Sequence, residues 1–399
     1  MKKTLLATSI ASIALSSAIS VQAQSFDELV KGGSVDLNFR YRVESADVQG
    51  GADAALANTL KSRATIKTGN MYGFSALVEG DNVFQLTDDF FDGGDNGNAN
   101  TEYDLILDQE TTQLNQAYLQ FDAADTTIKA GNQRINLDNQ RHVGGVAFRQ
   151  DEATFDAVSV TTKALANTTI FAALANNRNT ITNDNTEEDI SFLNVKYAID
   201  KDLSASVFYY GITDSPTTNG LVDYDTFGVR SMGSIEGISF EAELATQNKT
   251  TAAGSDFDSL YYHVNAGTKL GAVKATIGYE AFGSDGGNAA FATPLGTNHK
   301  FFGWSDVFLG GAGNDGIQDF YASGVSMISG IKVVGQFHNF SSVEGSDPLG
   351  NEVGVMINKS FGTYGAKFKV AQYFASDYAE NNLSKADTTK IWLTASAKF

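Results

Sequence analysis

An apolar–polar alternation with a period of two returns along the chain and constrains its fold more than any other feature. In the stretch 35–44 the apolar members are Val35, Leu37, Phe39, Tyr41 and Val43, and the polar members are Asp36, Asn38, Arg40, Arg42 and Glu44. Successive side chains of a β-strand point to opposite faces, so this stretch predicts a strand with one apolar and one polar face. Related patterns occur at 238–244, 273–280, 331–338, 364–370 and 388–399.

The N-terminal segment resembles an export signal. Lys2 and Lys3 precede an apolar stretch at 5–19, and Ala23 completes a small-residue cleavage pattern. We expect residues 1–23 to be removed as a signal peptide and residues 24–399 to form one domain. The alternative is that the segment stays attached as an amphipathic stretch.

Composition excludes several classes of protein. The chain without residues 1–23 keeps 26 basic and 47 acidic residues, a formal charge of −21 that is unsuited to electrostatic binding of nucleic acid. It has no cysteine, so no disulfide supports the fold. No later stretch approaches the 18 apolar residues of a transmembrane helix.

The connections between the predicted strands alternate in length. Short turns fall at 68–72, 122–126, 200–202, 233–237, 270–272, 329–330 and 362–363, and longer polar connections at 85–112, 177–189, 247–259, 282–316 and 341–350. Short periplasmic turns and long extracellular loops are typical of outer-membrane barrels. We therefore predict an all-β fold, a transmembrane antiparallel β-barrel of about 18 strands, which is wide enough for an aqueous lumen.

The last stretch, 388–399, is expected to be the closing strand and to pair with the strand near Val35. It ends on Phe399. A terminal aromatic of this kind resembles the C-terminal phenylalanine by which the barrel-assembly machinery recognises bacterial outer-membrane barrels.

Basic side chains on the predicted polar faces are the candidate pore-lining or substrate-binding residues. They are Arg40, Arg42, Lys61, Arg63, Arg134, Arg141, Arg149, Arg230, Lys274 and Lys367, with Lys196, Lys332 and Lys369 on similar faces. Guanidinium groups inside a low-dielectric wall concentrate positive potential and select anions. Alternatively, the arginines pair with Glu44, Glu79, Asp81 or Glu152 and brace the wall.

Two blocks of sequence resemble the alginate-export-like family of outer-membrane barrels. The first comprises 131–134, Asp138, Arg141, 144–145, 148–150 and 154–157, and the second comprises 298–306 and 316–321. Phe148 stands where that family's pattern has tryptophan. The resemblance implies an eighteen-stranded barrel with a basic constriction. The family's named member exports an anionic polysaccharide, whereas many of its relatives are similar to ordinary porins.

Catalytic and metal-binding chemistry has little support. The histidines are His142, His263, His299 and His338, and neither a G-x-S-x-G elbow nor an H-E-x-x-H motif occurs. A calcium-type nonapeptide at 310–317 occurs once, although such motifs act as stacked copies. The acidic run at 88–96 has oxygen ligands of the kind that chelate calcium, but it suits a metal-free flexible loop better. We expect no enzyme activity, no cofactor and no metal site.

Three functions follow as hypotheses for this chain in the outer membrane of a Gram-negative bacterium. The first is a channel for passive passage of small polar, anionic solutes or sugar acids. The second is a dedicated exporter of an anionic polysaccharide, and the third is a structural or adhesive barrel plugged by an inward-folded loop such as 85–112 or 282–316. Expected partners are outer-membrane lipid and lipopolysaccharide, the barrel-assembly machinery and the solute. The particular solute, the direction of transport and the oligomeric state stay open.

Overall fold

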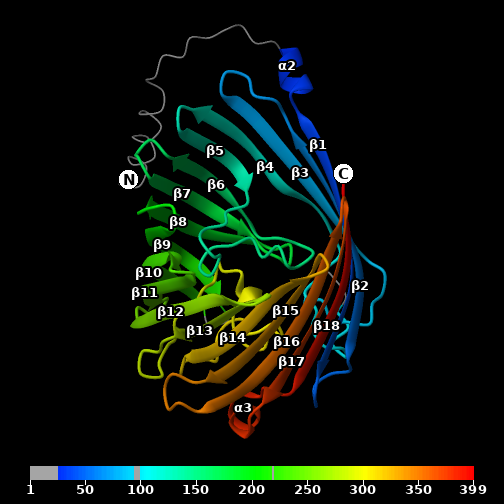
Figure 1. Cartoon of the computed structure of the whole chain (residues 1–399), viewed down its shortest axis with the longest axis vertical. Coiled ribbons are helices and arrows are strands. Elements are labelled where there is room, and N and C mark those ends of the chain that lie inside the picture. Colours follow the sequence, from blue (N-terminus) through cyan, green and yellow to red (C-terminus); the bar gives the residue numbers. More distant parts are fainter. Residues whose placement is uncertain (1–25, 94–98, 218–219) are drawn as a thin grey trace.

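A computed structural model describes residues 26–93, 99–217 and 220–399 of the chain, with the backbone alone at 26–28. The predicted signal peptide, residues 1–23, lies outside these ranges. Within them the chain is almost entirely β-sheet, arranged as a ring of strands (Figure 1).

Eighteen strands make up the sheet in the described residues. They are β1 (Ser34–Val48), β2 (Ala55–Lys67), β3 (Phe74–Gln85), β4 (Thr111–Ala123), β5 (Thr126–Gln133), β6 (Thr154–Thr162), β7 (Thr168–Asn179), β8 (Asn185–Ala198), β9 (Leu203–Thr217), β10 (Gly220–Ile235), β11 (Ile238–Thr251), β12 (Asp256–Leu270), β13 (Val273–Phe282), β14 (Ile317–Ile328), β15 (Ile331–Ser341), β16 (Pro348–Phe361), β17 (Tyr364–Ala375) and β18 (Thr388–Lys398). Three short helices accompany them: α2 (Phe26–Lys31), η1 (Asn298–Lys300) and α3 (Asp377–Leu383). Across the described ranges, no helix combines the length and hydrophobicity needed to cross a membrane.

The sheet closes on itself. Each strand pairs antiparallel with the next, and β18 pairs with β1 in a register that places Phe39 beside Ala397 and Tyr41 beside Ala395. The backbone of Phe399 exchanges two hydrogen bonds with Leu37, each 2.9 Å long. Closure leaves no unpaired edge, as a sheet that crosses a membrane requires. The predictions of an eighteen-stranded barrel and of its closing strand are confirmed.

The two faces of the wall differ as the alternation predicts. In β18, Trp392 is 1% exposed and points inward, whereas its neighbour Leu393 is 53% exposed. The same contrast holds along β1, where Leu37 and Tyr41 belong to the exposed apolar band and Glu44 is fully buried. Such a band is the face that a transmembrane barrel turns to lipid.

The two ends of the barrel have connections of different length. The short turns fall where they were predicted, but the connections at 177–189 and 247–259 are shorter than expected, because β7, β8, β11 and β12 extend into these polar stretches. A third long connection joins β5 to β6 at residues 134–153, beside those at 86–110 and 283–316. The sequence did not identify it as a loop, because its residues were interpreted as a family motif.

Loops 134–153 and 283–316 fold into the barrel and pack against each other and the wall (Figure 1). The Gly144 amide donates to the Leu295 carbonyl at 2.8 Å, and a Cβ on Gly144 would lie 2.2 Å from the Thr297 hydroxyl oxygen. Only glycine therefore permits the two loops to approach this closely.

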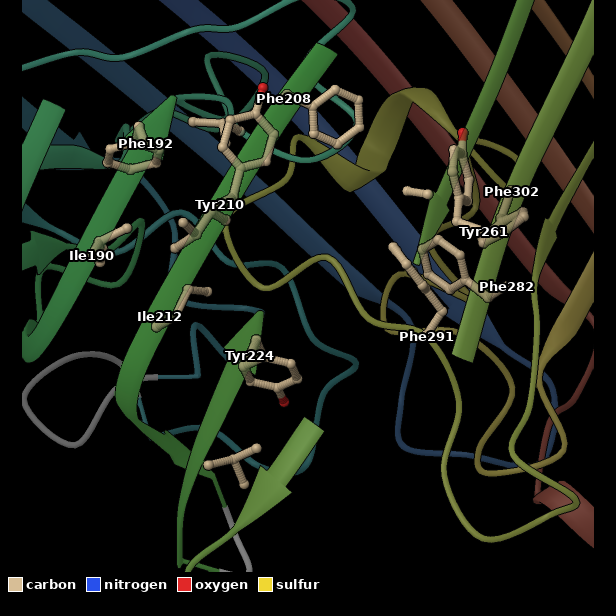
Figure 2. Packing of buried hydrophobic residues seen from close by; sticks show 14 of the residues in the cluster. Ile190, Phe192, Phe208, Tyr210, Ile212, Tyr224, Tyr261, Phe282, Phe291 and Phe302 are labelled. Carbon is tan, nitrogen blue, oxygen red and sulfur yellow. The ribbon is translucent and has the colours of Figure 1, made fainter. Parts of the chain in front are cut away.

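An apolar core fixes these loops inside the barrel. Val143 of loop 134–153 belongs to the same buried cluster as Phe291 and Phe302 of loop 283–316. Figure 2 shows the rings of Phe291 and Phe302 beside Tyr261 of β12 and Phe282 of β13. The centroids of Tyr261 and Phe291 are 5.5 Å apart, within the range of favourable ring contacts. Apolar packing thus seats both loops on the wall at β12 and β13.

Candidate functional site

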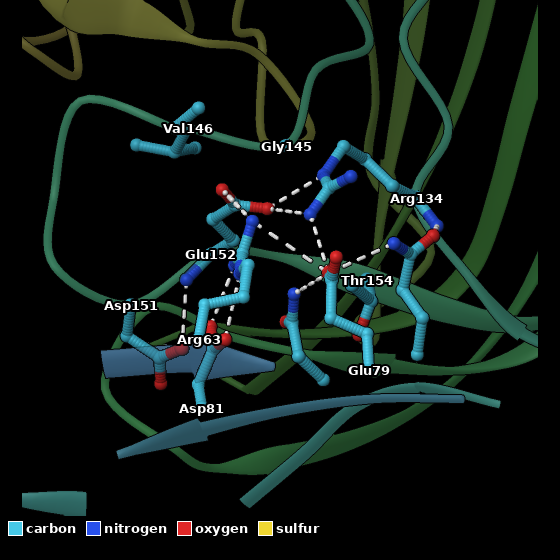
Figure 3. Close-up of polar contacts among 12 residues, drawn as sticks. Arg63, Glu79, Asp81, Arg134, Gly145, Val146, Asp151, Glu152 and Thr154 are labelled. Atoms are coloured by element: carbon cyan, nitrogen blue, oxygen red, sulfur yellow. Dashed lines mark hydrogen bonds and ion pairs between the residues drawn. The ribbon is translucent and has the colours of Figure 1, made fainter. Parts of the chain in front are cut away.

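A cluster of ion pairs anchors both ends of loop 134–153 to β2 and β3 (Figure 3). Arg63 of β2 donates from Nε to Asp81 Oδ1 and from Nη2 to Asp81 Oδ2, both at 2.6 Å. Its Nη1 reaches Glu152 Oε1 of the loop at 3.0 Å. Arginine suits this position because its planar fork binds one carboxylate through two parallel bonds and leaves a donor for another.

Two further cations complete this Arg63 cluster. Arg134 donates from Nη2 to Glu79 Oε1 at 2.9 Å and from Nε to Glu152 Oε2 at 2.5 Å. Lys61 Nζ lies 2.8 Å from Asp81 Oδ2. Although burial acts to raise it, the guanidinium groups of Arg134 and Arg63 hold the pKa of Glu152 below its usual range. Three cations face three carboxylates, so the cluster braces the wall and carries little net charge.

A second cluster joins the other part of loop 134–153 to β1 and to loop 283–316. Arg149 Nη1 lies 3.0 Å from Glu44 Oε1 of β1, and its Nη2 lies 3.2 Å from Asp306 Oδ2. Burial acts to lower the pKa of Arg149, but Glu44 and the other carboxylates around it raise that pKa above its ordinary value.

Arg42 of β1 takes part in the same cluster. It donates from Nη2 to the Phe148 carbonyl at 2.6 Å, and its Nη1 lies 3.5 Å from Asp108 of loop 86–110. One side chain of the wall thus contacts two of the long loops.

Two more predicted lining residues, Arg141 of loop 134–153 and Arg230 of β10, lie in buried ion pairs elsewhere in the lumen. Arg141 is fully buried, with Nε 2.6 Å from Glu280 Oε1 and its guanidinium carbon 4.4–4.5 Å from three phenylalanine ring centroids. Arg230 Nη2 lies 3.0 Å from Glu241 Oε1, and its Nε lies 3.3 Å from Glu243 Oε2. Both guanidinium groups are enclosed by protein.

Three cations differ from these because they face no carboxylate. Lys332 and Lys367 are exposed, and no carboxylate oxygen of the described residues lies within 4 Å of either ammonium group. Arg40 donates to the Gln150 side chain at 2.7 Å and to the carbonyls of Ala147 and Arg149, with no ion pair to a described carboxylate.

Lys332 and Lys367 lie on a continuous row of cross-strand partners that leads to Arg42. The sheet register runs Lys332, Asn358, Lys367, Thr394, Arg42 from β15 through to β1. Barrel strands are tilted, so a row of register partners slopes along the barrel axis. Strands β1 and β15 both begin at the short-turn end of the barrel. Arg42 is the ninth residue of β1 and lies near the inner loops, whereas Lys332 is the second residue of β15, so the row slopes from the inner loops at Arg42 to the short turns at Lys332.

Lys274 is not part of this arrangement. Like Lys332, it is the second residue of its strand and is exposed at the short-turn end, but its cross-strand partners are Lys269 and Val325, which do not belong to the row. Six residues of extended strand, about 20 Å, separate it from Glu280 near the inner loops. The structure therefore places nine of the ten predicted basic residues around the inner loops or along the row, and leaves Lys274 apart.

The neighbouring arc of wall, β11 to β15, carries acidic and imidazole groups around a cavity of about 270 Å³. Its polar lining includes Glu241, His263, Glu280, Asp319, Tyr321 and His338. His338 Nδ1 lies 2.7 Å from Asp319 Oδ2, and His263 Nε2 lies 2.8 Å from the Tyr321 hydroxyl. In the described part of the chain, no three His, Asp or Glu side chains form a group that could hold a metal ion.

The fold is shared with solved structures although the sequence is not. Neither a known protein family nor a curated protein matches the sequence. OccK9 (OpdG) of Pseudomonas aeruginosa superposes with a TM-score of 0.70 at 13% identity, covering 93% of this chain and 99% of that one. OccAB2 of Acinetobacter baumannii gives 0.69 at 17% identity with the same coverage, and the P. aeruginosa outer membrane protein OpdK gives 0.69 at 11%. At these identities the likeness establishes the barrel architecture alone.

Sequence reasoning found part of this site. The four carboxylates named as bracing partners, Glu44, Glu79, Asp81 and Glu152, all form ion pairs. It missed Asp108 and Asp306, which lie in loops where no periodicity shows which side chains turn inward. Asp306 does close the second block of the family resemblance, which is the one signal that could have drawn attention to it.

Proposed function

We propose that the protein is an outer-membrane channel for passive passage of small polar, anionic solutes. The observation that carries this proposal is the sloping row of Arg42, Lys367 and Lys332, together with Arg40 beside it, which runs from the inner loops toward the short turns. Lys367 and Lys332, which have no carboxylate partner among the described residues, raise the local concentration of anions along a water-filled wall and offer successive weak sites.

The buried clusters have a different part in this proposal. Arg63, Arg134 and Arg149 hold loop 134–153 inside the lumen, and their charge is compensated by the carboxylates they contact. A constriction held in this way narrows the passage and forces a solute past the basic row. Selectivity is therefore assigned to Lys367, Lys332 and Arg40, and bracing to the paired arginines.

Reversal potentials test this division of roles. We expect the purified protein to form conducting channels in planar bilayers and to prefer anions under a salt gradient. Replacing Lys332, Lys367 and Arg40 together by alanine should shift the reversal potential toward cations, and Lys274→Ala should leave it unchanged. An unshifted reversal potential in the triple variant would contradict the assignment.

A plugged structural or adhesive barrel is the second candidate, and the inward packing of loops 134–153 and 283–316 favours it. The same bilayer measurement separates the two functions, since a plugged barrel inserts without conductance steps. Deleting residues 286–315 would then open the lumen and produce such steps.

The remaining expectations accompany this proposal. We place the protein in the outer membrane of a Gram-negative bacterium, exported through a signal peptide at residues 1–23 and inserted by the barrel-assembly machinery among lipid and lipopolysaccharide. Dedicated export of an anionic polysaccharide, as the alginate-export-like resemblance implies, would require a neighbouring polysaccharide synthase and periplasmic scaffold. No enzymatic role is proposed.

A further inference from the structure

Lys369 of β17 occupies a cage of aromatic rings. Its ammonium nitrogen lies 4.1 Å from the ring centroid of Phe148, 4.1 Å from that of Trp392 and 5.1 Å from that of Trp304. A cation within about 6 Å of a ring centroid is attracted by the ring's quadrupole, and more strongly where water is excluded. Lys369 is 4% exposed, so water is largely excluded here.

The cage is assembled from three separate parts of the chain. Phe148 belongs to loop 134–153, Trp304 to loop 283–316 and Trp392 to β18 of the wall. The Phe148 ring also stacks on His299 of loop 283–316, with the centroids 3.4 Å apart and the planes 13° from parallel. One ammonium group therefore contacts both inner loops and the wall at once.

His299 gives the ammonium a directed hydrogen-bond partner. Its Nε2 is within hydrogen-bond distance of Lys369 Nζ, and its Nδ1 lies 2.6 Å from Asp306 Oδ1. Burial lowers the pKa of His299 to about 3, so the ring is neutral. A carboxylate can only accept a hydrogen bond, which places the ring proton on Nδ1, facing Asp306, and leaves Nε2 to accept from Lys369.

Asp306 completes the arrangement. Its Oδ2 lies 3.2 Å from Arg149 Nη2 and 3.6 Å from Lys390 Nζ of β18. Burial acts to raise the pKa of Asp306, but the groups around it, the two cations included, hold that pKa well below its usual range. The series Asp306, His299, Lys369 thus runs from a carboxylate to an ammonium with each hydrogen bond fixed in direction.

We propose that Phe148, Trp304, Trp392 and His299 form a binding site for a primary alkylammonium group, which Lys369 of the same chain occupies. Lys369 is thereby the positioning residue that holds loops 134–153 and 283–316 in the constriction. The effect of this site on single-channel currents rests on the proposed channel function. The cage itself is testable without conduction, because Trp304 and Trp392 are the only tryptophans of the chain.

The first experiment measures tryptophan emission of the purified full chain in detergent. In Lys369→Ala we expect the emission maximum to shift relative to the parent protein, and n-propylammonium to reverse the shift saturably. Tetramethylammonium, which has no N–H to donate to His299, should reverse it at least about tenfold less effectively. The matched control is Lys367→Ala, two residues away on the same face and outside the cage, whose emission should match the parent and ignore both amines.

The second experiment follows single channels in planar bilayers. In Lys369→Ala we expect brief current transitions to become about tenfold more frequent, because the inner loops lose a shared cation–π anchor, and n-propylammonium should quieten them. Lys367→Ala should shift the reversal potential without added transitions. If Lys369→Ala fails to fold, Lys369→Met retains the apolar stem, and it should show the emission shift and the transitions without rescue.

The outcomes separate this inference from the proposed function. An unshifted emission in both Lys369 variants, or equal rescue by the two amines, overturns the ammonium site whether or not the barrel conducts. If channels of the Lys369 variants show no added current transitions, the positioning role of Lys369 is contradicted. A parent protein without conductance contradicts the channel function and leaves the emission experiment to decide on the cage.

Discussion

The lumen contains two regions of basic side chains that look alike in sequence and differ in their partners. Around Arg63, each cation forms ion pairs with buried carboxylates of β3 and loop 134–153. Along the row, Lys332 and Lys367 are exposed and have no carboxylate of the described residues within 4 Å. The comparison teaches that the side chains across the lumen decide whether an inward-facing basic residue braces the wall or attracts anions. The sequence of its own strand does not reveal these partners.

Breaking the braced region should have the largest effect. Arg63→Met leaves Asp81 buried beside Glu79 and Glu152 with too little positive charge, and removing one partner of a buried ion pair costs about 3–5 kcal/mol. We expect a clear drop in the denaturant midpoint of the protein in detergent. Lys332→Met in the exposed row should change the free energy of unfolding by less than about 0.5 kcal/mol. Equal effects in the two variants would contradict the distinction between the braced region and the exposed row.

The braced region should also respond to pH through Asp151, which neighbours Glu152. Burial raises the pKa of Asp151 to about 7, with Asp81 and Glu152 acting in the same direction. Because this pKa lies above that of the unfolded chain, the folded state binds the proton more tightly, and stability falls as pH rises from about 4 through about 7.

Asp151→Asn tests this dependence. It should raise the melting temperature at pH 8 and change it little at pH 4, by circular dichroism in detergent. The neutral amide can still accept the hydrogen bonds from Gln113 and from the Glu152 amide. Parallel pH profiles for the variant and the parent would show that Asp151 ionises normally.

Reversing a charge in the exposed row should change permeation and leave stability alone. Lys367→Glu alters the charge by two units, which at about 8 Å in water disfavours a monovalent anion by about 1 kcal/mol and favours a cation by the same amount. The anion-to-cation permeability ratio should therefore fall by up to about thirtyfold. Lys274→Glu makes the same change at the short-turn end and serves as the control. A shift of equal size in the control would mean that position along the lumen does not matter.

The smallest expected effect lies on the acidic arc. Glu241→Gln removes one negative charge from the cavity between β11 and β15, which by the same estimate is worth about 0.5 kcal/mol for each ion with opposite sign, so the permeability ratio should move up to about fivefold toward anions. Reversal potentials under a salt gradient measure this as well. A shift toward cations would indicate that the lost contacts to Arg230 and Asn139 had rearranged the wall.

The sequence predicted the wall of the barrel much better than the loops that fold inside it. A period of two is a local signal, so residues such as Leu393 and Trp392 could be assigned to opposite faces. Counting the alternating segments between short and long connections predicted about 18 strands. The inner loops are held by contacts between distant positions, such as Arg149 with Asp306, 157 residues apart. No local pattern encodes such a pair, so the inward folding of loop 134–153 could not be predicted.

The loops from the middle of the chain are bonded to its two ends. Loop 134–153 contacts Glu44 on the first strand, and loop 283–316 contacts Lys390 on the last. Both sets of ion pairs can exist together only when β1 and β18 already lie side by side. The contacts of the interior and the seam between the chain's two ends therefore stabilise each other, so that loosening either one weakens the other.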